Sequence, residues 1–415
     1  ADRIDRLEGD SRLDPINRWQ AEWNLGRALQ AEGRVGQAYA RVNRVMVEDE
    51  GDSPLPPELA VRMAWLQIRL ALDVNEPERA LELAPALMGR LAEVDPVLGE
   101  EVASSLRLME AEAHFDLALR DDNPAQRDEA LVVLQALRQA FPESDAAVYS
   151  FIEEAGAEAA QGQLVKAQQL LTELTQSYPD NRYAPYALYQ SALLAESRRE
   201  EDFLKEAYTK IEQLVTLYPG SELVFYARFK QGDLLRKMGL WEPARLVYED
   251  IIRNFPQHED VWSVQMALAD SLAAQAGSDV SLHDSAAAIY ERLRDVASAP
   301  MELRIEAGFK AGSAMARRDA FAQAARTWWQ VVDQFLVQNE DPLALGTRGR
   351  YWLARILAQL GEGLEQADKL LDARRAYRLM LDYELPETAW AAAQLSRLGE
   401  GSPEETAPVV DAVGQ

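Results

Sequence analysis

An aromatic residue followed by proline recurs along the chain, and this recurrence limits the folds that the sequence can adopt. Tyr218-Pro219 and Phe255-Pro256 stand 37 residues apart, and two apolar runs at helical spacing lie between them, separated by Gly239. Proline has a fixed φ and no N–H, so it ends one helix and suits the first turn of the next. Each interval therefore predicts a pair of helices, and its repetition predicts an array of helical hairpins.

The spacing of small and aromatic residues identifies further copies of this unit. Counted from Gly239, an alanine follows after five residues, an aromatic residue after nine and another after sixteen. A small residue at the first of these positions lets two helices approach closely. Strong copies are aligned on the inter-helix residues Ala125, Gly162, Asp202, Gly239 and Asp319, and weaker copies on Gly33, Asn75, Ser281 and Leu360-Gly361. We expect about nine helix pairs over residues 17–384.

The ends of the chain differ from this array. Residues 1–16 form an N-terminal segment ahead of the first pair. Residues 385–398 contain an apolar helix with no later partner, which is typical of a cap on the exposed end of a repeat array. Residues 399–415 mix Gly, Pro, Glu and Ala without helical period, and we expect a mobile acidic tail. Alternating β-branched runs are scarce, so the expected fold class is all-α.

The charge balance argues against nucleic acid as a partner. The chain has 69 acidic and 43 basic residues and a formal net charge of -26 at pH 7, which repels phosphate backbones. No apolar run approaches the roughly 20 residues that a helix needs to cross a bilayer. The chain begins at Ala1 instead of Met, so we expect a trimmed form from which a signal peptide or a lipid-anchoring cysteine has been removed. The oligomeric state stays open.

No set of residues typical of catalysis, or of binding a cofactor or a metal ion, is found. His114, His258 and His283 fall at unlike offsets in three units, so we expect them to point in different directions. The chain has no G-x-S-x-G, P-loop or H-E-x-x-H motif. The sequence therefore favours a non-enzymatic protein with no catalytic residue, no cofactor and no metal.

The repeated positions resemble those of the tetratricopeptide repeat, a family whose unit has about 34 residues. The resemblance rests on two stretches, Trp19…Leu25-Gly26…Gly33…Ala38 and Gln231-Gly232…Gly239…Ala244…Tyr248…Pro256. It implies a right-handed superhelical solenoid in which the first helix of each pair lines a concave groove. It also implies a scaffold or adaptor that binds a peptide or protein partner in that groove.

Two segments narrow the resemblance to one subtype. "YPDNRYAPYALYQSA" and "YPGSELVFYARFKQG" are similar to units of the TolA-binding protein and of outer-membrane assembly lipoproteins. This similarity implies a location in the periplasm or at the outer membrane of a Gram-negative cell. Cytoplasmic arrays share the pattern, so a cytoplasmic adaptor is the alternative, as is a spacer in an envelope assembly that binds through its ends or loops.

Candidate groove residues lie on the predicted first helices. Thirteen residues before the inter-helix residue stand three tyrosines, and a second aromatic position follows three residues later. Basic residues beside them could receive a carboxylate of the partner. The candidates are Tyr149, Tyr189, Tyr226, Phe229, Arg236, Phe309, Arg348, Tyr351 and Arg355. The alternative is that the rings pack against the preceding helix and that the arginines are ordinary charges at helix C-termini.

Overall fold

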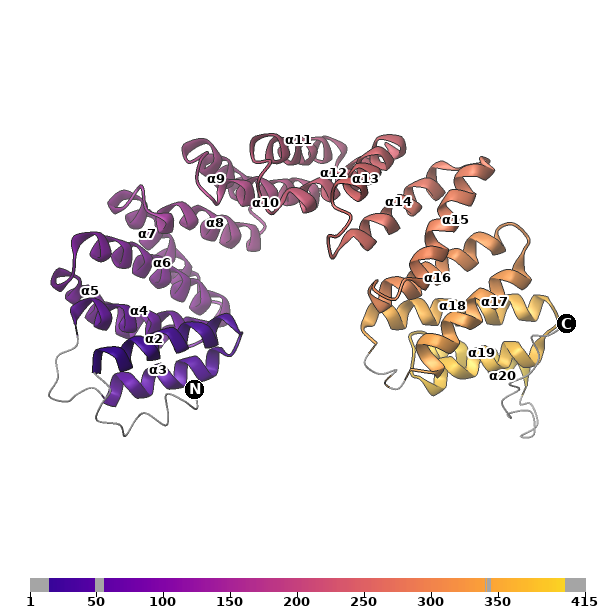
Figure 1. Cartoon of the computed structure of the whole chain (residues 1–415), viewed down its shortest axis with the longest axis horizontal. Coiled ribbons are helices and arrows are strands. Elements are labelled where there is room, and N and C mark those ends of the chain that lie inside the picture. Colours follow the sequence, from indigo (N-terminus) through magenta and orange to yellow (C-terminus); the bar gives the residue numbers. More distant parts are fainter. Residues whose placement is uncertain (1–14, 49–55, 340, 342–344, 400–415) are drawn as a thin grey trace. The chain divides into compact units, whose positions relative to one another are not determined.

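The computed structural model describes residues 15–48, 56–339, 341 and 345–399. These residues form nineteen α-helices and no strand, which confirms the all-α class. The helices follow one another in packed antiparallel pairs (Figure 1). We call the first helix of each pair the A helix and the second the B helix. The chain divides into two compact units, Ala1–Leu214 (unit 1) and Val215–Gln415 (unit 2).

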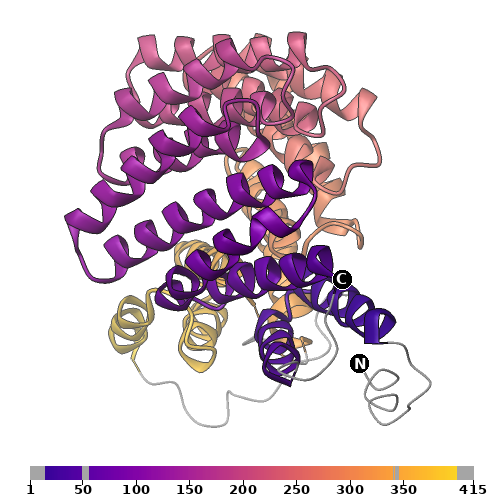
Figure 2. The same ribbon diagram turned by 90° about the vertical axis from the view of Figure 1, so that its left-hand side faces the viewer.

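Unit 1 contains five helix pairs. Its A helices are α2 (Pro15–Ala31), α4 (Pro57–Asp73), α6 (Pro96–Arg120), α8 (Asp145–Ala160) and α10 (Ala184–Ser197). Its B helices are α3 (Val35–Glu48), α5 (Pro77–Arg90), α7 (Pro124–Ala140), α9 (Leu164–Ser177) and α11 (Glu201–Leu217), and a 3-10 turn, η1 (Leu91–Glu93), follows α5. The A helices α2, α4, α6 and α8 contact one another in succession, so they share one face of the unit (Figure 2).

Unit 2 contains four helix pairs and a final single helix. Its A helices are α12 (Val224–Lys237), α14 (Val261–Gln275), α16 (Met301–Ala316) and α18 (Thr347–Gln366). Its B helices are α13 (Trp241–Asn254), α15 (Val280–Asp295), α17 (Phe321–Val332) and α19 (Leu370–Asp382), and a π-helical turn, η2 (Asp333–Val337), follows α17. The last helix, α20 (Thr388–Leu398), packs on α19, as expected of a cap.

A residue with positive φ stands in the turn between the two helices of every described pair. Glycine adopts this conformation without steric cost, and Asn and Asp tolerate it better than most residues. The nine turn residues are Gly33, Asn75, Asp122, Gly162, Arg199, Gly239, Gly277, Asp319 and Asp368. The expected number of about nine pairs is therefore confirmed for the described residues.

Four of these turn residues differ from those predicted by spacing. The turns fall at Asp122, Arg199 and Gly277 instead of Ala125, Asp202 and Ser281, because α7, α11 and α15 each begin three residues earlier relative to their buried alanine. The predicted turn at Leu360-Gly361 is wrong, because α18 continues to Gln366 and the turn follows at Asp368. The residues between the predicted and the observed turns therefore belong mainly to the longer helices α7, α11, α15 and α18.

A buried alanine stands in the first half of every B helix, five residues after the turn in six pairs and eight or nine residues after it in the other three. All nine alanines are at most 2% exposed: Ala38, Ala80, Ala130, Ala167, Ala207, Ala244, Ala286, Ala324 and Ala373. A larger side chain there would push the two helix axes apart, because protein interiors are close-packed. The predicted role of this position is therefore consistent with its burial.

Large aromatic rings of unit 2 lie against glycines of the paired A helix. A Cβ atom at Gly232 would lie 2.3 Å from the ring of Tyr248, and one at Gly361 would lie 2.2 Å from the ring of Tyr377. Gly312 stands in the same relation to Trp328. In α8 and α10, where the A helix carries Ala155 and Ala195, the residues sixteen places later are Leu171 and Ile211. The same pair of positions is thus filled either by glycine and an aromatic ring or by alanine and an aliphatic side chain.

Candidate partner-binding surface

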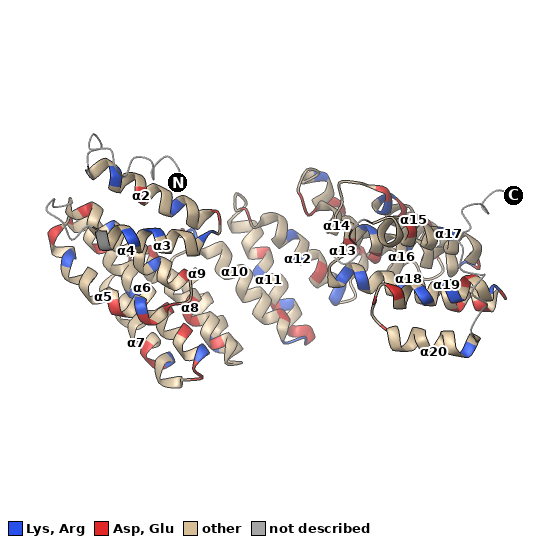
Figure 3. Cartoon of the chain, turned by 90° about the horizontal axis from the view of Figure 1, so that it is seen from below, with Lys and Arg blue, Asp and Glu red and all other residues tan. Residues whose placement is uncertain are grey.

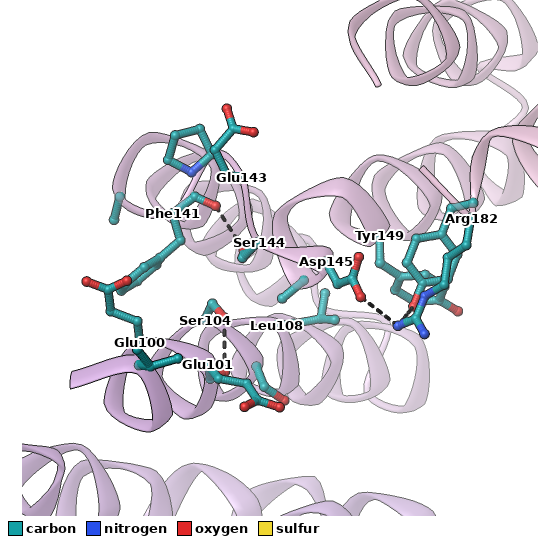
Figure 4. A pocket seen from close by; sticks show the side chains of 16 residues that line it. Glu100, Glu101, Ser104, Leu108, Phe141, Glu143, Ser144, Asp145, Tyr149 and Arg182 are labelled. Atoms are coloured by element: carbon teal, nitrogen blue, oxygen red, sulfur yellow. Dashed lines mark hydrogen bonds and ion pairs between the residues drawn. The ribbon is translucent and has the colours of Figure 1, made fainter. Parts of the chain in front are cut away.

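The A-helix face of unit 1 is hollowed between α6 and α8. The cavity has a volume of about 860 Å³, and we call it the α6–α8 hollow. Its residues come from α6, from the loop between α7 and α8, from the start of α8 and from the segment before α10 (Figure 4). They are Val97, Glu100, Glu101, Ser104, Ser105, Leu108, Ala140, Phe141, Pro142, Glu143, Ser144, Asp145, Ala146, Tyr149, Arg182 and Tyr183.

Carboxylates outnumber cations around this hollow. Its basic residue, Arg182, already pairs with Asp145 at 2.8 Å. Glu100, Glu101 and Glu143 are exposed and have no cationic partner among the described residues. Acidic and basic residues are interspersed along the helices of each unit (Figure 3). The α6–α8 hollow is therefore a local excess of negative charge on an accessible surface.

Tyr149 forms one wall of the hollow and is half-buried. Its ring lies 5.1 Å from the ring of Tyr183, between centroids. Burial and the neighbouring carboxylate of Glu153, which accepts a hydrogen bond from the hydroxyl, raise the pKa of Tyr149 to about 12. The phenol therefore stays protonated at neutral pH, and it offers an apolar ring with a polar tip to the hollow.

Further carboxylates continue along the same face beyond Tyr149. Burial, followed by nearby carboxylates, raises the pKa of Glu153 on α8 and that of Glu112 on α6 above the ordinary range. Arg69 of α4 partly compensates them, because it pairs with Glu112 at 2.5 Å and with Asp73 at 2.8 Å. Arg69 is thus the cation that acts on this group of carboxylates from three adjacent A helices.

A second hollow of about 300 Å³ adjoins the first along the A-helix face. It is lined by Trp23 and Arg27 of α2, by Arg62 and Trp65 of α4, and by Leu98, Glu101, Val102 and Ser105 of α6. Glu101 and Ser105 border both hollows, so the two lie side by side. The guanidinium of Arg27 lies 5.7 Å from the ring of Trp23 and 5.9 Å from that of Trp65, which is a cation–π geometry.

The predicted tyrosine stripe has a different register in the second of its three units. Counted from the observed turns, Tyr149 and Tyr226 stand thirteen residues before Gly162 and Gly239, and the equivalent residue before Arg199 is Tyr186. Tyr189 instead occupies the position of Ile152 and Phe229. The difference follows from the extra turn of α11. Tyr186 is 39% exposed and Tyr189 is half-buried.

Tyr226, Phe229 and Arg236 of α12 are half-buried, and Tyr226 contacts the next repeat. The hydroxyl of Tyr226 donates to Asp260 at 3.0 Å, and its ring meets His258 edge to face. Phe229 packs edge to face on Tyr248. Arg236 lies 3.5 Å from Asp233 on its own helix. These contacts fix the side chains in place while leaving part of each exposed.

The remaining predicted residues lie on α16 and α18. Phe309 is buried, at 8% exposed, and its ring packs against Trp328 and Trp352. Arg348 is exposed, but it pairs with Glu306 at 2.5 Å.

Tyr351 is 43% exposed, and its hydroxyl lies 3.0 Å from Arg355. The guanidinium of Arg355 also lies 5.2 Å from the ring of Phe309, and it has no carboxylate partner among the described residues. Arg355 is therefore the predicted arginine whose charge is least compensated.

Sequence reasoning did not identify Trp23, Trp65 or Tyr183 as candidates. A signal for the two tryptophans was present, because they stand ten residues before Gly33 and Asn75, at the offset of Phe229 before Gly239. Tyr183 precedes its helix and has no such signal. Among the described residues, no group of three or more His, Asp or Glu is placed to hold a metal ion. The described helices also include none with the length and apolar character that spanning a bilayer requires.

Comparison with known proteins identifies the repeat. Residues 226–258 match the family model of the tetratricopeptide repeat. No curated protein matches the sequence.

Three solved structures illustrate the likeness in fold. MamA from Desulfovibrio magneticus is 18% identical, covers 46% of this chain and 97% of its own, and has a TM-score of 0.36. A tetratricopeptide repeat protein from Parabacteroides merdae is 14% identical, covers 72% and 98%, and has a TM-score of 0.38. The quorum sensor NprR from B. thuringiensis is 12% identical, covers 79% and 99%, and has a TM-score of 0.39.

The matched segment contains α12 and α13, whose positive-φ turn and buried alanine recur in all nine described helix pairs. The chain therefore has a helical repeat fold of the tetratricopeptide type, with a matched repeat at residues 226–258.

Proposed function

We propose that the chain is a non-enzymatic adaptor that holds a peptide or protein partner on the A-helix face of unit 1. The observation that carries this proposal is the pair of adjoining hollows that Glu101 and Ser105 both border. Aromatic residues line both, and aromatic side chains in accessible pockets are the usual anchors of protein interfaces. The repeat fold agrees with this role, because stacked helix pairs create extended binding surfaces.

A second surface on unit 2 is part of the proposal. Tyr351 and Arg355 of α18 are exposed beside Trp352, and Arg355 has no carboxylate partner among the described residues. An arginine on an aromatic platform can receive a carboxylate of a partner. We include Tyr226, Phe229 and Arg236 on α12 as further partner contacts of unit 2.

The proposed location is the periplasm or the outer membrane of a Gram-negative cell. Its support is the similarity of the units that begin at Tyr178 and Tyr218 to those of envelope proteins. The coding sequence upstream of Ala1 tests it, because a signal peptide or a lipobox cysteine would place the protein in the envelope. An upstream sequence with neither would favour the cytoplasmic adaptor.

Site-specific photo-crosslinking in the native cells tests the adaptor function. A photoreactive residue at position 183 in the α6–α8 hollow should capture a defined partner, whereas the same residue in place of Val132 should not. Val132 is 59% exposed on the B helix α7, so it serves as the matched surface control.

Substitution of Tyr149 then separates binding from folding. Tyr149→Ala should reduce crosslinking from position 183 at unchanged melting temperature, because the ring is a half-buried wall of the hollow. Tyr149→Phe keeps the contact area and should retain most of the crosslinking. Equal capture from positions 183 and 132, or capture that survives Tyr149→Ala, would contradict binding on the A-helix face.

A further inference from the structure

We propose that the α6–α8 hollow binds a cationic segment of the partner, in which Lys or Arg side chains stand beside apolar ones. This inference rests on the proposed function, because it gives the chemistry of the segment that the A-helix face of unit 1 would hold. It follows from the charges, the apolar surface and the neighbouring groups of the hollow.

The negative charge of the hollow is complementary to cations of a partner. Glu100 and Glu101 come from α6 and Glu143 comes from the α7–α8 loop, so acidic groups border the hollow on two sides (Figure 4). Its own cation, Arg182, is held by Asp145. A partner's Lys or Arg could therefore pair with these glutamates without displacing any cation that the described residues provide.

The apolar surface of the hollow suits the stems of long cationic side chains. Val97 is 76% exposed at its edge, and Leu108 and Phe141 are half-buried within it. Lys and Arg lay their methylene groups on such surfaces while the charged head stays hydrated. The ring of Tyr149 offers a face for a guanidinium, while that of Tyr183 already lies 5.0 Å from the guanidinium of Arg182.

The groups beyond Tyr149 extend the same negative field, while the second hollow adds Arg27 and Arg62 on the side of Glu101. Glu153 of α8 faces Glu112 and Asp116 of α6, and Arg69 is the cation among their neighbours. Asp73 lies on the far side of Arg69 and takes part of its charge. Carboxylates that gather in one concave region raise the local concentration of a cationic ligand and speed its encounter.

Charge also excludes two other occupants of the hollow. The C-terminal residues 400–415 contain Glu400, Glu404, Glu405 and Asp411 and no Lys or Arg, so like charges would repel this tail. A second copy of the chain, at a formal net charge of -26, would be repelled as a whole. A partner of opposite charge is the complementary occupant.

Fluorescence anisotropy with labelled peptides tests the inference. The probe is a short peptide rich in Arg and Tyr, and its counterparts carry Gln or Glu in place of Arg. We expect the Arg peptide to bind the full chain more tightly than the Gln peptide and the Glu peptide not to bind. The triple variant Glu100→Gln, Glu101→Gln and Glu143→Gln should weaken binding of the Arg peptide about tenfold, since each exposed pair contributes modestly.

A matched variant separates the local site from the general charge of the protein. Glu129→Gln, Glu173→Gln and Glu212→Gln make the same charge change at exposed positions of the B helices α7, α9 and α11 of unit 1. This variant should leave the affinity within about twofold. Equal weakening by both triple variants would show only attraction to an acidic protein, and a Gln peptide that binds as well as the Arg peptide would also overturn the inference.

The two proposals fail in different experiments. A partner that crosslinks from position 183 but is unaffected by the first triple variant would overturn the cationic segment and leave the adaptor intact. The absence of any partner captured from position 183 would overturn the adaptor itself. All six substitutions are at exposed glutamates, so circular dichroism should show unchanged folding for both variants.

Discussion

Replacing Gly232 with alanine tests whether the ring of Tyr248 sets the packing of α12 against α13. The added Cβ would lie 2.3 Å from one ring carbon and 2.8 Å from two others. Tyr248 is 0% exposed, and its hydroxyl donates to Asp233 at 2.9 Å, so the ring cannot move outward without losing that bond. Alanine gains about 1 kcal/mol of helix propensity over glycine, whereas overpacking costs about 1–3 kcal/mol. With three overlapping carbons, we expect a net loss of about 2 kcal/mol of unfolding free energy.

The partner substitution should rescue this loss. Tyr248→Leu alone should cost about 2–3 kcal/mol, because it leaves a cavity in a fully buried site. The double variant Gly232→Ala/Tyr248→Leu recreates the combination of Ala155 with Leu171 in unit 1. It should therefore be no less stable than Tyr248→Leu alone, which corresponds to a favourable coupling energy of about 2 kcal/mol.

Urea denaturation of the four proteins, followed by far-ultraviolet circular dichroism, measures this cycle. Hydrogen exchange should place the change in α12 and α13, because repeats interact mainly with their nearest neighbours. Gly156→Ala is the control, since a Cβ at Gly156 meets no atom within 4 Å, and it should stabilise unit 1 slightly. Additive effects of the two substitutions, within about 0.5 kcal/mol, would refute the role assigned to the ring.

Three further predictions concern packing and pH. Ala244→Leu should lower the unfolding free energy by about 1–3 kcal/mol in urea denaturation, because Ala244 is 0% exposed between paired helices; a neutral result would contradict the close approach. Burial raises the pKa of Glu153, so folded unit 1 holds this proton more strongly than the unfolded chain, and the carboxyl's contribution to stability falls as pH rises from 4.5 through the folded pKa. Glu153→Gln should remove that fall in thermal melts measured across this range. Burial alone would raise the pKa of Glu306, but Lys310 and Arg348 lower it, so its contribution is present above pH 4.5 and is lost as pH falls through the folded pKa. Glu306→Gln should lower the melting temperature at neutral pH and reduce its fall at acid pH; an unchanged fall at acid pH would contradict the role of the ion pairs.

The repeat positions made most of the fold predictable. Glycine at Gly33, Gly162 and Gly239 meets the positive φ of the turn, and the alanine five residues later marks a contact that excludes a large side chain, so these residue types report the local structure. The turns at Asp122 and Arg199 were misplaced by three residues. An extra helical turn leaves the alanine and the later aromatic residue in register, so spacing from those residues cannot reveal it.

The candidate site was less predictable, because its boundaries depend on neighbouring repeats. The α6–α8 hollow combines residues of two A helices, α6 and α8, with the α7–α8 loop and with Tyr183, which precedes α10. The offset from the turn found Tyr149, because that tyrosine lies on a helix with a recognisable turn residue, Gly162. It found Phe309 by the same rule, although that ring is covered by Trp352 and Arg355. An offset gives the face of a helix, whereas exposure depends on what the next repeat places over it.

Whether a charged side chain is available to a partner also depends on what the adjacent repeat places beside it. Arg348 pairs with Glu306, 42 residues earlier, and Lys310 pairs with Asp270, 40 residues earlier. In unit 1, Arg69 pairs with Glu112 at a separation of 43 residues. Each separation is about one repeat, so the counter-ion of each of these residues stands on an adjacent A helix. An arginine is available to a partner only where the adjacent repeat lacks a carboxylate, and a glutamate only where it lacks a cation. Arg355 and the glutamates of the α6–α8 hollow meet this condition among the described residues, which is why the proposed contacts centre on them.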